Sequence, residues 1–457
     1  MINRSVGRDS SASLKTGAFG TVVSVVTLVL VHILNSQPAG AEEAEQVTLV
    51  IGGDLGLGGS GQRVDERGAR RHGKLHPWDK LTKGLAGLVD GDLNFANLET
   101  IVTSNNSLRP GRKAFTFRSH PAGVRHLVDL GFNVFSTANN HVGDYGARGM
   151  RETLSELDKL RAHGLLAFPG LGATRKDAGG PATVEAKGRR LSFSAIGIGG
   201  WKPSKSSPGI LGYYAKQDFN EAVDLLHLET AHYRVLSVHY NIELDVRPSR
   251  QDIRKLRDHA VGKKGIDLVI GHHAHVPAGI QEINGRLIFY GLGNLLHPGM
   301  QNMSRFGPCR DYGLLAKIHL ASNETGALSA RAVEVWPLER MHLKARPMTG
   351  KKAKRRIRVL NKLAEELDHK KTGAKGIRFL VREDGSGLAC FPGAATAGGR
   401  IGELCRDWDA TTVGSQPSRS VSCARRKYVR SSRGKPKAKR RRASSTPSVL
   451  EQVFGWQ

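Results

Sequence analysis

Acidic, aromatic and cysteine residues are scarce in this sequence of 457 residues. Asp and Glu number 41 against 69 Lys and Arg, so the formal net charge is +28. Such a chain attracts polyanions, whether nucleic acid, an anionic membrane surface or an acidic polymer. The four cysteines form no C-x-x-C pair, which argues against a cysteine zinc site. After residue 34 no segment is apolar and long enough to cross a membrane.

The N-terminus has the three regions of a secretory signal peptide. Three basic residues precede an apolar run at 18–34, and the small residues Ala39-Gly40-Ala41 follow. We therefore expect residues 1–41 to be removed after Ala41 and the mature protein to be periplasmic or secreted. The alternative is an uncleaved N-terminal anchor, because the run is about the shortest that spans a bilayer. Export argues against a nucleic-acid partner.

The even number of cysteines suggests disulfides in an exported protein. Cys309, Cys390, Cys405 and Cys423 can pair in three ways. The last three are close in sequence, so we expect at least one bridge within the C-terminal segment. Free thiols are the alternative.

Short β-branched runs alternate with amphipathic stretches from Val47 onward, which predicts an α/β fold whose helices cover sheets. Asn284-Gly285 separates two of these runs and is a strong hairpin signal. The expected strands are 47–51, 93–98, 133–137, 190–198, 233–238, 267–270, 280–283, 287–290, 312–319 and 330–336. The expected helices are 121–130, 149–163 and 250–261.

The character of the chain changes after Leu338. We place one domain at 47–338 and a small, basic and Gly-rich segment at 339–409, which a disulfide can staple. This segment is expected to hold a helix at 351–371 and a strand at 377–382. Residues 410–457 are predicted to form a basic disordered tail, since twelve Lys and Arg and no Asp or Glu lie between 410 and 450. Aromatic residues do not alternate with these basic residues, as stacking on nucleic-acid bases would require.

Polar side chains follow the C-terminal ends of five predicted strands, the edge at which open α/β sheets build their sites. They are Asp54, Glu99, Asn140 with His141, His239, and His273 with His275. Imidazole suits Zn, Fe and Mn, and carboxylate favours Mn, Fe or Mg. Each motif alone has an ordinary explanation, such as a polar turn or a core histidine. Five strand ends that carry such groups together favour a shared metal site.

The motifs, taken in order, resemble the CapA family of bacterial capsule-synthesis and poly-γ-glutamate proteins. The matching residues are Gly53-Asp54, Asn97-Leu98-Glu99, Ala138-Asn139-Asn140-His141 with Asp144-Tyr145-Gly146, His239 with Glu243, Gly271-His272-His273 with His275, and Tyr290-Gly291-Leu292-Gly293-Asn294. The family belongs to the calcineurin-like metallophosphatase superfamily. The resemblance therefore implies a four-layer αββα sandwich with a metal site at the loop edge, followed here by a basic C-terminal extension.

The resemblance also implies roles for single residues. The implied ligands of divalent ions (Mn, Fe, Zn or Mg) are Asp54, Glu99, Asn140, His239, His273 and His275. His141 is the implied general acid, and Asp144 orients it. Arg118, Asn97 and Glu243 are the implied substrate-binding residues.

Two departures from the family patterns bear on catalysis. The usual His-Trp-Gly-x-Glu motif is His239-Tyr240-Asn241-Ile242-Glu243 here. Gly56 stands where metallophosphatases have a histidine two residues after the first aspartate, a difference that the whole family shares. This difference weakens one metal position.

Two functions of different classes remain open from the sequence. The first is an exported metal-dependent hydrolase-type protein of capsule or poly-γ-glutamate synthesis, in which two metal ions activate a water. The second is a non-catalytic assembly factor that binds the anionic polymer and works with other envelope proteins of capsule assembly. Retention of all the ligand types favours metal binding.

Overall fold

The computed structural model describes residues 46–323, 326–415 and 423. The predicted signal peptide, 1–41, lies outside the described residues, as does most of the predicted basic tail. Among the described helices, none combines the length and the apolar character that a membrane span requires.

The larger sheet has nine described strands in the order β19-β20-β16-β15-β1-β4-β7, with β14 beside β1 and β17 beside β16. Its strands are β1 (Gln46–Leu55), β4 (Leu93–Leu98), β7 (Val134–Ser136), β14 (Asn294–Leu296), β15 (Gly313–Ser322), β16 (Leu328–Glu339), β17 (Arg346–Pro347), β19 (Leu380–Val381) and β20 (Gly387–Cys390). β4 and β14 run parallel to β1, and β7 runs parallel to β4, whereas β15 pairs with β1 antiparallel.

The second sheet has seven described strands in the order β18-β12-β13-β11-β10-β9-β8. They are β8 (Ala182–Ala186), β9 (Arg189–Gly197), β10 (Tyr233–His239), β11 (Leu268–His272), β12 (Ile280–Ile283), β13 (Arg286–Phe289) and β18 (Lys375–Gly376). β9, β10, β11 and β13 are parallel, and the expected hairpin joins β12 to β13. Two short ladders complete the strands: β2 (Gly68–Arg71) with β3 (Lys74–Pro77), and β5 (Ile101–Val102) with β6 (Arg118–Ser119).

The two sheets pack face to face through alternate side chains of their strands. Ile51 and Phe95 of the larger sheet share one buried cluster with Val235 and Leu268 of the smaller. The rings of Phe95 and Phe193 stack across the interface with centroids 6.3 Å apart. Because side chains alternate along a strand, the neighbouring residues face outward, where they need a second layer of cover.

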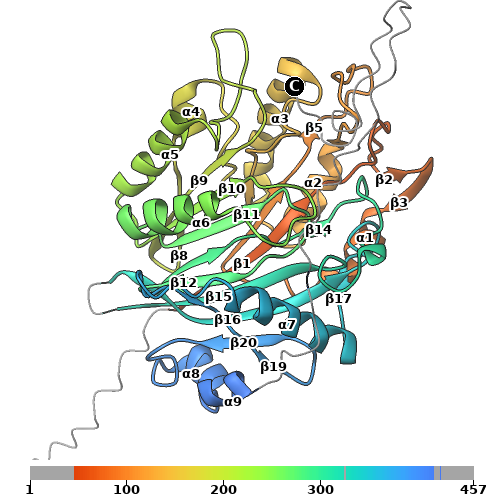
Figure 1. The fold of residues 1–457 in the computed structure, drawn as a ribbon. Coiled ribbons are helices and arrows are strands. Elements are labelled where there is room, and N and C mark those ends of the chain that lie inside the picture. Colours follow the sequence, from red (N-terminus) through yellow and green to blue (C-terminus); the bar gives the residue numbers. More distant parts are fainter. Residues whose placement is uncertain (1–45, 324–325, 416–422, 424–457) are drawn as a thin grey trace, which may run out of the picture. The chain divides into compact units, whose positions relative to one another are not determined.

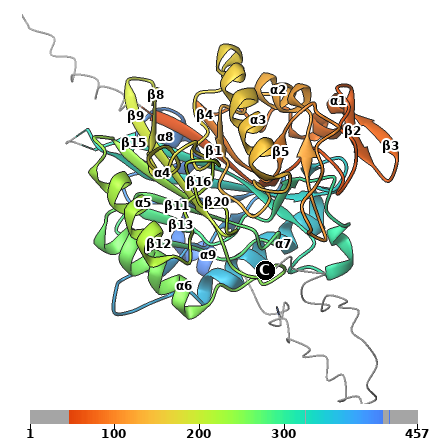
Figure 2. The same cartoon turned by 90° about the horizontal axis from the view of Figure 1, so that it is seen from above.

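Helices provide that cover. Leu236 and Val269 pack outward against Phe219, Val223 and Leu256 in a second cluster. Figure 1 shows α5 and α6 on one side of the sheets, and Figure 2 shows α2 and α3 on the other. The helices are α1 (Trp78–Thr82), α2 (Pro121–Asp129), α3 (Gly146–Lys159), α4 (Arg175–Gly179), α5 (Lys216–Leu228), α6 (Arg250–Arg254) with a π-helical continuation (Lys255–Lys263), α7 (Gly350–Glu365), α8 (Gly399–Cys405) and α9 (Ala410–Ser415). The expectation of an α/β fold is confirmed as two mixed sheets with helices.

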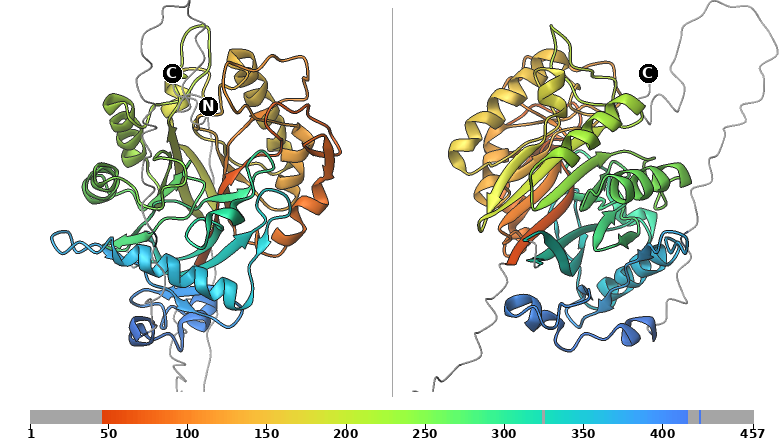
Figure 3. Two further views of the ribbon diagram at one scale, coloured as in Figure 1. Left: turned by 45° about the vertical axis from the view of Figure 1, so that its right-hand side comes forward. Right: turned by 90° about the vertical axis from the view of Figure 1, so that its left-hand side faces the viewer.

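Residues after Leu338 extend both sheets, since β20 pairs with β16 and β18 pairs with β12. The helix expected at 351–371 ends earlier, at Glu365. The strand expected at 377–382 is reduced to Leu380–Val381, because the backbone N–H and C=O of Phe379 bond to the side chain of Asn361 instead of a neighbouring strand. Figure 3 shows this blue segment on the side of the sheets away from the yellow α3 and α4.

Two disulfides join the cysteines. Cys390 of β20 is bonded to Cys405 of α8, within the C-terminal segment. Cys309 is bonded to Cys423, across 114 positions of sequence. The second bond ties the first part of the basic region to the loop before β15.

Candidate metal centre

Parallel pairing brings the ends of several strands to one edge. Asp54 at the end of β1 is aligned with Asn97 of β4 and with Asn294 of β14. In the other sheet, His239 at the end of β10 is aligned with His272 at the end of β11. Polar motifs that are far apart in sequence therefore lie together at one edge of the sheets, as the sequence predicted.

Asp54 lies fully buried at the centre of this edge. Asn97 Nδ2 donates to its Oδ1 at 2.9 Å, and the backbone N–H of His273 donates to its Oδ2 at 3.1 Å. Nδ1 of His272 and Nδ1 of His275 each lie 3.2 Å from an oxygen of Asp54. Burial raises the pKa of Asp54, but hydrogen bonding to the two histidines outweighs burial and holds it well below its usual value. Asp54 is therefore an anion in the folded chain.

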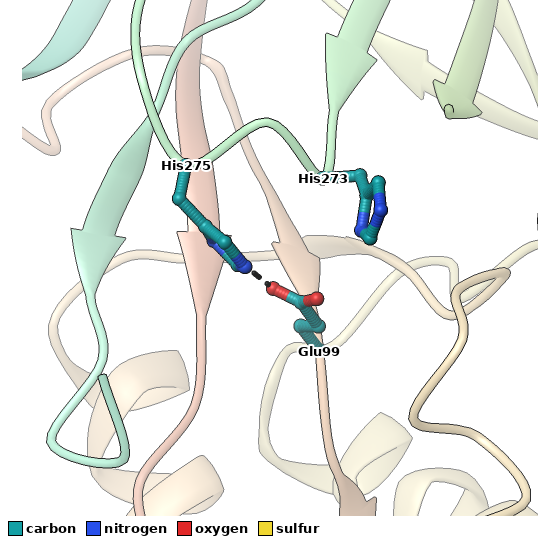
Figure 4. Close-up of side chains that lie close together, drawn as sticks. All are labelled: Glu99, His273 and His275. Atoms are coloured by element: carbon teal, nitrogen blue, oxygen red, sulfur yellow. Dashed lines mark ion pairs between the residues drawn. The ribbon is translucent and has the colours of Figure 1, made fainter. Parts of the chain in front are cut away.

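Glu99 has no hydrogen-bond partner for either carboxylate oxygen among the described residues, although it is fully buried. His239 Nε2 lies 3.3 Å from its Oε1, and His275 Nδ1 lies 3.8 Å from its Oε2. Figure 4 shows Glu99 and His275 pointing toward each other, with His273 beside them. One ligand atom from each of these three residues lies within 4.8 Å of the others. Burial raises the pKa of Glu99 well above its usual value, the sign of a carboxylate that lacks compensation.

The histidines divide by protonation state. Burial lowers the pKa of His275, but Glu99 and Asp54 outweigh it and raise this pKa to about 10. Without a cation, a protonated His275 supplies positive charge between two carboxylates, and binding a metal through His275 would release that proton. Burial, reinforced by His275, lowers the pKa of His273 to about 3, and burial also lowers that of His239 well below its usual value. His273 and His239 are therefore neutral, the form in which imidazole binds a metal.

Local bonds fix the orientation of these side chains. His239 Nε2 lies 2.8 Å from Asn140 Oδ1, and Asn97 Nδ2 lies 3.2 Å from His239 Nδ1. The loop after β11 holds His273 at φ 83° and His275 at φ 57°. Positive φ is uncommon for residues with a Cβ, and such strain persists where the surrounding structure imposes it, often at functional sites.

His141, Asp144 and Lys113 form a connected group at the wall of the site. His141 Nδ1 donates to Asp144 Oδ2 at 2.7 Å, and Lys113 Nζ donates to Asp144 Oδ1 at 2.6 Å. The backbone N–H of Phe117 also donates to Asp144, at 2.6 Å. His141 Nε2 is thereby left 3.9 Å from Glu99 Oε1. Burial lowers the pKa of His141, and the nearby Asp144 carboxylate opposes that effect.

The three implied substrate-binding residues lie in different surroundings. Asn97 is fully buried and orients Asp54 and His239. Glu243 lines the cavity described below. The Arg118 guanidinium donates to two backbone carbonyls, at 3.0 Å and 3.3 Å, and lies over the ring of Tyr145. Arg118 is not among the residues that line the cavity.

Three residues at the site were not predicted from the sequence. Lys113 Nζ donates to Asp144, and His272 Nδ1 lies 3.2 Å from Asp54 Oδ1. His297 is fully buried, with Nε2 3.9 Å from Glu99 Oε2. His272 stands inside a motif that the sequence did single out. His297 lies three positions after Asn294, the last residue of a motif that the sequence singled out, but no local pattern marked it.

A cavity of about 620 Å³ opens above the cluster. Asn140, His141 and His275 form part of its wall. Besides His141 and His275, its cationic and imidazole lining comprises Arg71, His72, Lys113 and Arg305, against the single carboxylate of Glu243. Phe115 and Phe117 add aromatic surface. The charged side chains of the cavity wall are therefore mainly basic.

A divalent cation fits the chemistry of the cluster around Glu99. Glu99 presents two unpartnered oxygens, and Nδ1 of His273 is also buried without a partner among the described residues. Buried polar atoms without partners cost free energy, and a bound cation would remove that cost. Carboxylate, amide oxygen and imidazole are the ligand types of Mn, Fe and Zn sites.

Comparisons with known proteins agree on one family for this chain. Residues 48–298 match the bacterial capsule synthesis protein family PGA_cap. The chain is 29% identical over 245 residues to the PGA biosynthesis protein CapA of Bacillus subtilis (strain 168), covering 52% of this chain and 60% of that protein. It is 25% identical over 328 residues to the capsule biosynthesis protein CapA of Bacillus anthracis, covering 70% of this chain and 74% of that protein.

A solved structure of a hypothetical protein from Thermus thermophilus aligns at a TM-score of 0.34 and 17% identity, over 64% of this chain and 99% of that chain. This alignment is too weak to inform the site. The PGA_cap match, in contrast, covers more than half of the 457 residues. The chain belongs to the family of bacterial capsule synthesis proteins, PGA_cap.

Proposed function

We propose that this protein is an exported, metal-dependent hydrolase-type protein of capsule synthesis that acts on an anionic polymer such as poly-γ-glutamate. The observation that carries the proposal is the buried Glu99 carboxylate, which lacks hydrogen-bond partners among the described residues. It forms a cluster with His273 and with His275, and His275 lines a large cavity. A site that is costly without a cation is explained most simply by a cation that it binds.

The basic wall of the cavity supports an anionic substrate. Arg71 is held in place because its guanidinium donates to the carbonyl of Pro298 at 3.0 Å. Arg305 lines the same cavity, and the whole chain carries a formal charge of +28. Electrostatic attraction of a polyanion needs no sequence-specific contacts and falls as salt rises.

The residues divide the chemical work. Asp54, Glu99, Asn140, His239, His273 and His275 would hold the cation or cations. A bound divalent ion would lower the pKa of a water molecule toward neutrality and so supply a nucleophile. Asp144 holds the Nδ1–H of His141, so His141 exchanges protons at Nε2 and can deliver one to the leaving group.

Two histidine variants test the proposal. His273→Ala should lower Mn²⁺ content and thermal stability, because it removes a ligand. His141→Ala should keep the Mn²⁺ content and lower turnover by about a hundredfold or more, the usual range for a lost acid or base. Metal analysis, thermal melting and assays on phosphoesters and poly-γ-glutamate measure these effects. Full metal occupancy in His273→Ala, or wild-type protein that binds no divalent metal, would contradict the proposal.

A second candidate is a non-catalytic assembly factor that binds the polymer. The basic cavity wall favours it independently of the metal, since Arg71 and Arg305 can attract a polyanion by charge alone. Salt-sensitive binding of poly-γ-glutamate by wild type and by His141→Ala alike, with no turnover of any substrate by wild type, would select this candidate.

A further inference from the structure

His297 lies beside the metal centre because of strand pairing. β14 runs parallel to β1, with Leu296 aligned with Leu55, so His297 emerges next to Gly56. Gly56 donates its backbone N–H to the carbonyl of Leu296 at 3.0 Å, and His297 donates its own to the carbonyl of Met341 at 2.7 Å. The position of the His297 backbone is therefore fixed on both sides.

Gly56 leaves the space that the His297 imidazole occupies. A Cβ atom at position 56 would lie 2.9 Å from both Cε1 and Nε2 of His297, closer than real Cβ contacts. Gly56 is not among the residues with positive φ, so space rather than backbone conformation requires glycine here. The missing side chain at position 56 and the imidazole from position 297 are thus complementary.

The His297 ring has no hydrogen-bond partner for Nδ1 or Nε2 among the described residues. A buried histidine with a purely structural role usually finds such partners. His319 illustrates this: its Nε2 lies 2.9 Å from Glu334 Oε1, and its Nδ1 lies 3.3 Å from Thr48 Oγ1. His297 instead directs its Nε2 toward Glu99, at 3.9 Å from Oε2.

The two oxygens of Glu99 face different groups. Oε1 faces His239, at 3.3 Å, and His141, at 3.9 Å. Oε2 faces His275, at 3.8 Å, and His297, at 3.9 Å. A carboxylate placed between two sets of nitrogen atoms can serve two neighbouring cations, one for each oxygen.

We propose that His297 binds a second divalent cation on the Oε2 side of Glu99. The other ligands there would be Asp54 and His275, whose side chains already lie 3.2 Å apart. Together they make two carboxylates and two imidazoles, a donor set that suits Zn or Mn. His297 thereby supplies, from a different strand, the imidazole that a side chain at position 56 cannot provide. The inference rests on the proposed metal centre and adds a ligand to it.

Metal stoichiometry tests the inference apart from any activity. Equilibrium dialysis of the wild-type protein against Mn²⁺ should give two ions per chain. His297→Ala should bind one ion with wild-type affinity and the other at least about tenfold more weakly, a loss that is common even for residues that only orient a ligand. Imidazole added to His297→Ala should restore the second ion. His227→Ala, an exposed histidine at the end of α5, is the matched control and should bind two.

The outcomes separate this inference from the function on which it rests. Two tightly bound ions in His297→Ala would overturn the role of His297 and leave the metal centre intact. No bound ion in the wild-type protein would overturn both. Should His297→Ala fail to fold, anomalous diffraction from Zn²⁺-soaked wild-type crystals decides: a peak about 2.1 Å from a ring nitrogen of His297 is expected. A peak only among His239, His273 and Asn140 would contradict the inference.

Discussion

Glu99 at the candidate metal centre and two carboxylates beneath the C-terminal segment are all buried, but they differ in their hydrogen-bond partners. Beneath the segment, Glu334 accepts from His319 at 2.9 Å and from Arg382 at 2.5 Å, and Arg356 donates to both oxygens of Asp311. At the metal centre, the Glu99 oxygens have no such donors among the described residues.

The carboxylates beneath the segment pair with side chains from another part of the chain. Glu99 instead has unpartnered oxygens that could bind a ligand. Arg382 and Arg356 belong to the segment after Leu338, and their carboxylate partners belong to the sheet region before or at β16. Each pair supplies its own hydrogen-bond partners, so it needs no ligand to offset the cost of burying its charges. The Glu99 carboxylate lacks such partners among the described residues, so a bound cation would lower its free energy.

The largest change in stability is expected where the C-terminal segment pairs with the carboxylate of Asp311. Arg356→Met should leave Asp311 buried without a partner and lower the free energy of unfolding by about 3–5 kcal/mol, the usual cost of breaking a buried pair from one side. Urea unfolding measures this change. Arg355→Met, on the exposed face of the same helix, is the control and should change stability by less than about 0.5 kcal/mol. Equal effects of the two variants would show that the Asp311–Arg356 pair does not stabilise the fold.

A smaller loss of stability is expected when low pH protonates Glu334. Burial raises the pKa of Glu334, but His319 and Arg382 outweigh it and lower this pKa to about 2. Because the folded pKa is below the unfolded value, the stabilisation is complete above pH 4.5 and is lost as the pH falls toward 2. It amounts to an upper limit on the order of 3 kcal/mol.

The variant Glu334→Gln isolates that contribution. The stability difference between wild type and Glu334→Gln, from urea unfolding, should be large at neutral pH and shrink below pH 4.5. Glu383→Gln is the matched control, because Glu383 pairs with Lys354 while 97% exposed. It should change stability by less than about 1 kcal/mol at any pH. A constant difference for Glu334→Gln would show that its charge is not what stabilises the segment.

The smallest effect, with a change of sign, is expected at the metal centre. In metal-free protein, Glu99→Gln should raise the free energy of unfolding by up to about 1 kcal/mol, because it removes a poorly compensated buried carboxyl group. With Mn²⁺ in hundredfold excess over its dissociation constant, wild type should gain about 2.7 kcal/mol and the variant much less. Thermal melting with and without chelator measures both. A loss of stability in metal-free Glu99→Gln would show that the Glu99 carboxylate stabilises the fold, as the carboxylates beneath the C-terminal segment do.

The sequence predicted the strands and the polar residues at their ends because both depend on local patterns. The polar residues that lie at or after strand ends are Asp54, Glu99, Asn140, His239, His273 and His275. Parallel pairing brings these strand ends to one edge of the sheets. The contacts of Arg118 were not predictable in the same way. Its bonds to the carbonyls of Gln62 and Asn105 depend on how two irregular loops close.

His297 and Phe379 are two further residues whose contacts could not be predicted from local sequence. His297 belongs to the centre only because β14 pairs with β1, a long-range pairing that no local pattern specifies. The apolar run at 377–382 looks like a strand, yet the side chain of Asn361 takes both backbone groups of Phe379. In each case a contact between distant residues overrides the local preference.

The bond between Cys309 and Cys423 changes what cleavage of the backbone can achieve. Cys309 follows the cavity-lining residues Arg305 and Phe306, and the carbonyl of Cys423 accepts from Arg247. A protease that cut the chain between Ser415 and Cys423 would leave the eleven Lys and Arg of 425–442 covalently attached to the domain. After a cut at that place, release of the basic stretch would also require reduction of the disulfide, whereas a cut after Cys423 would release it directly.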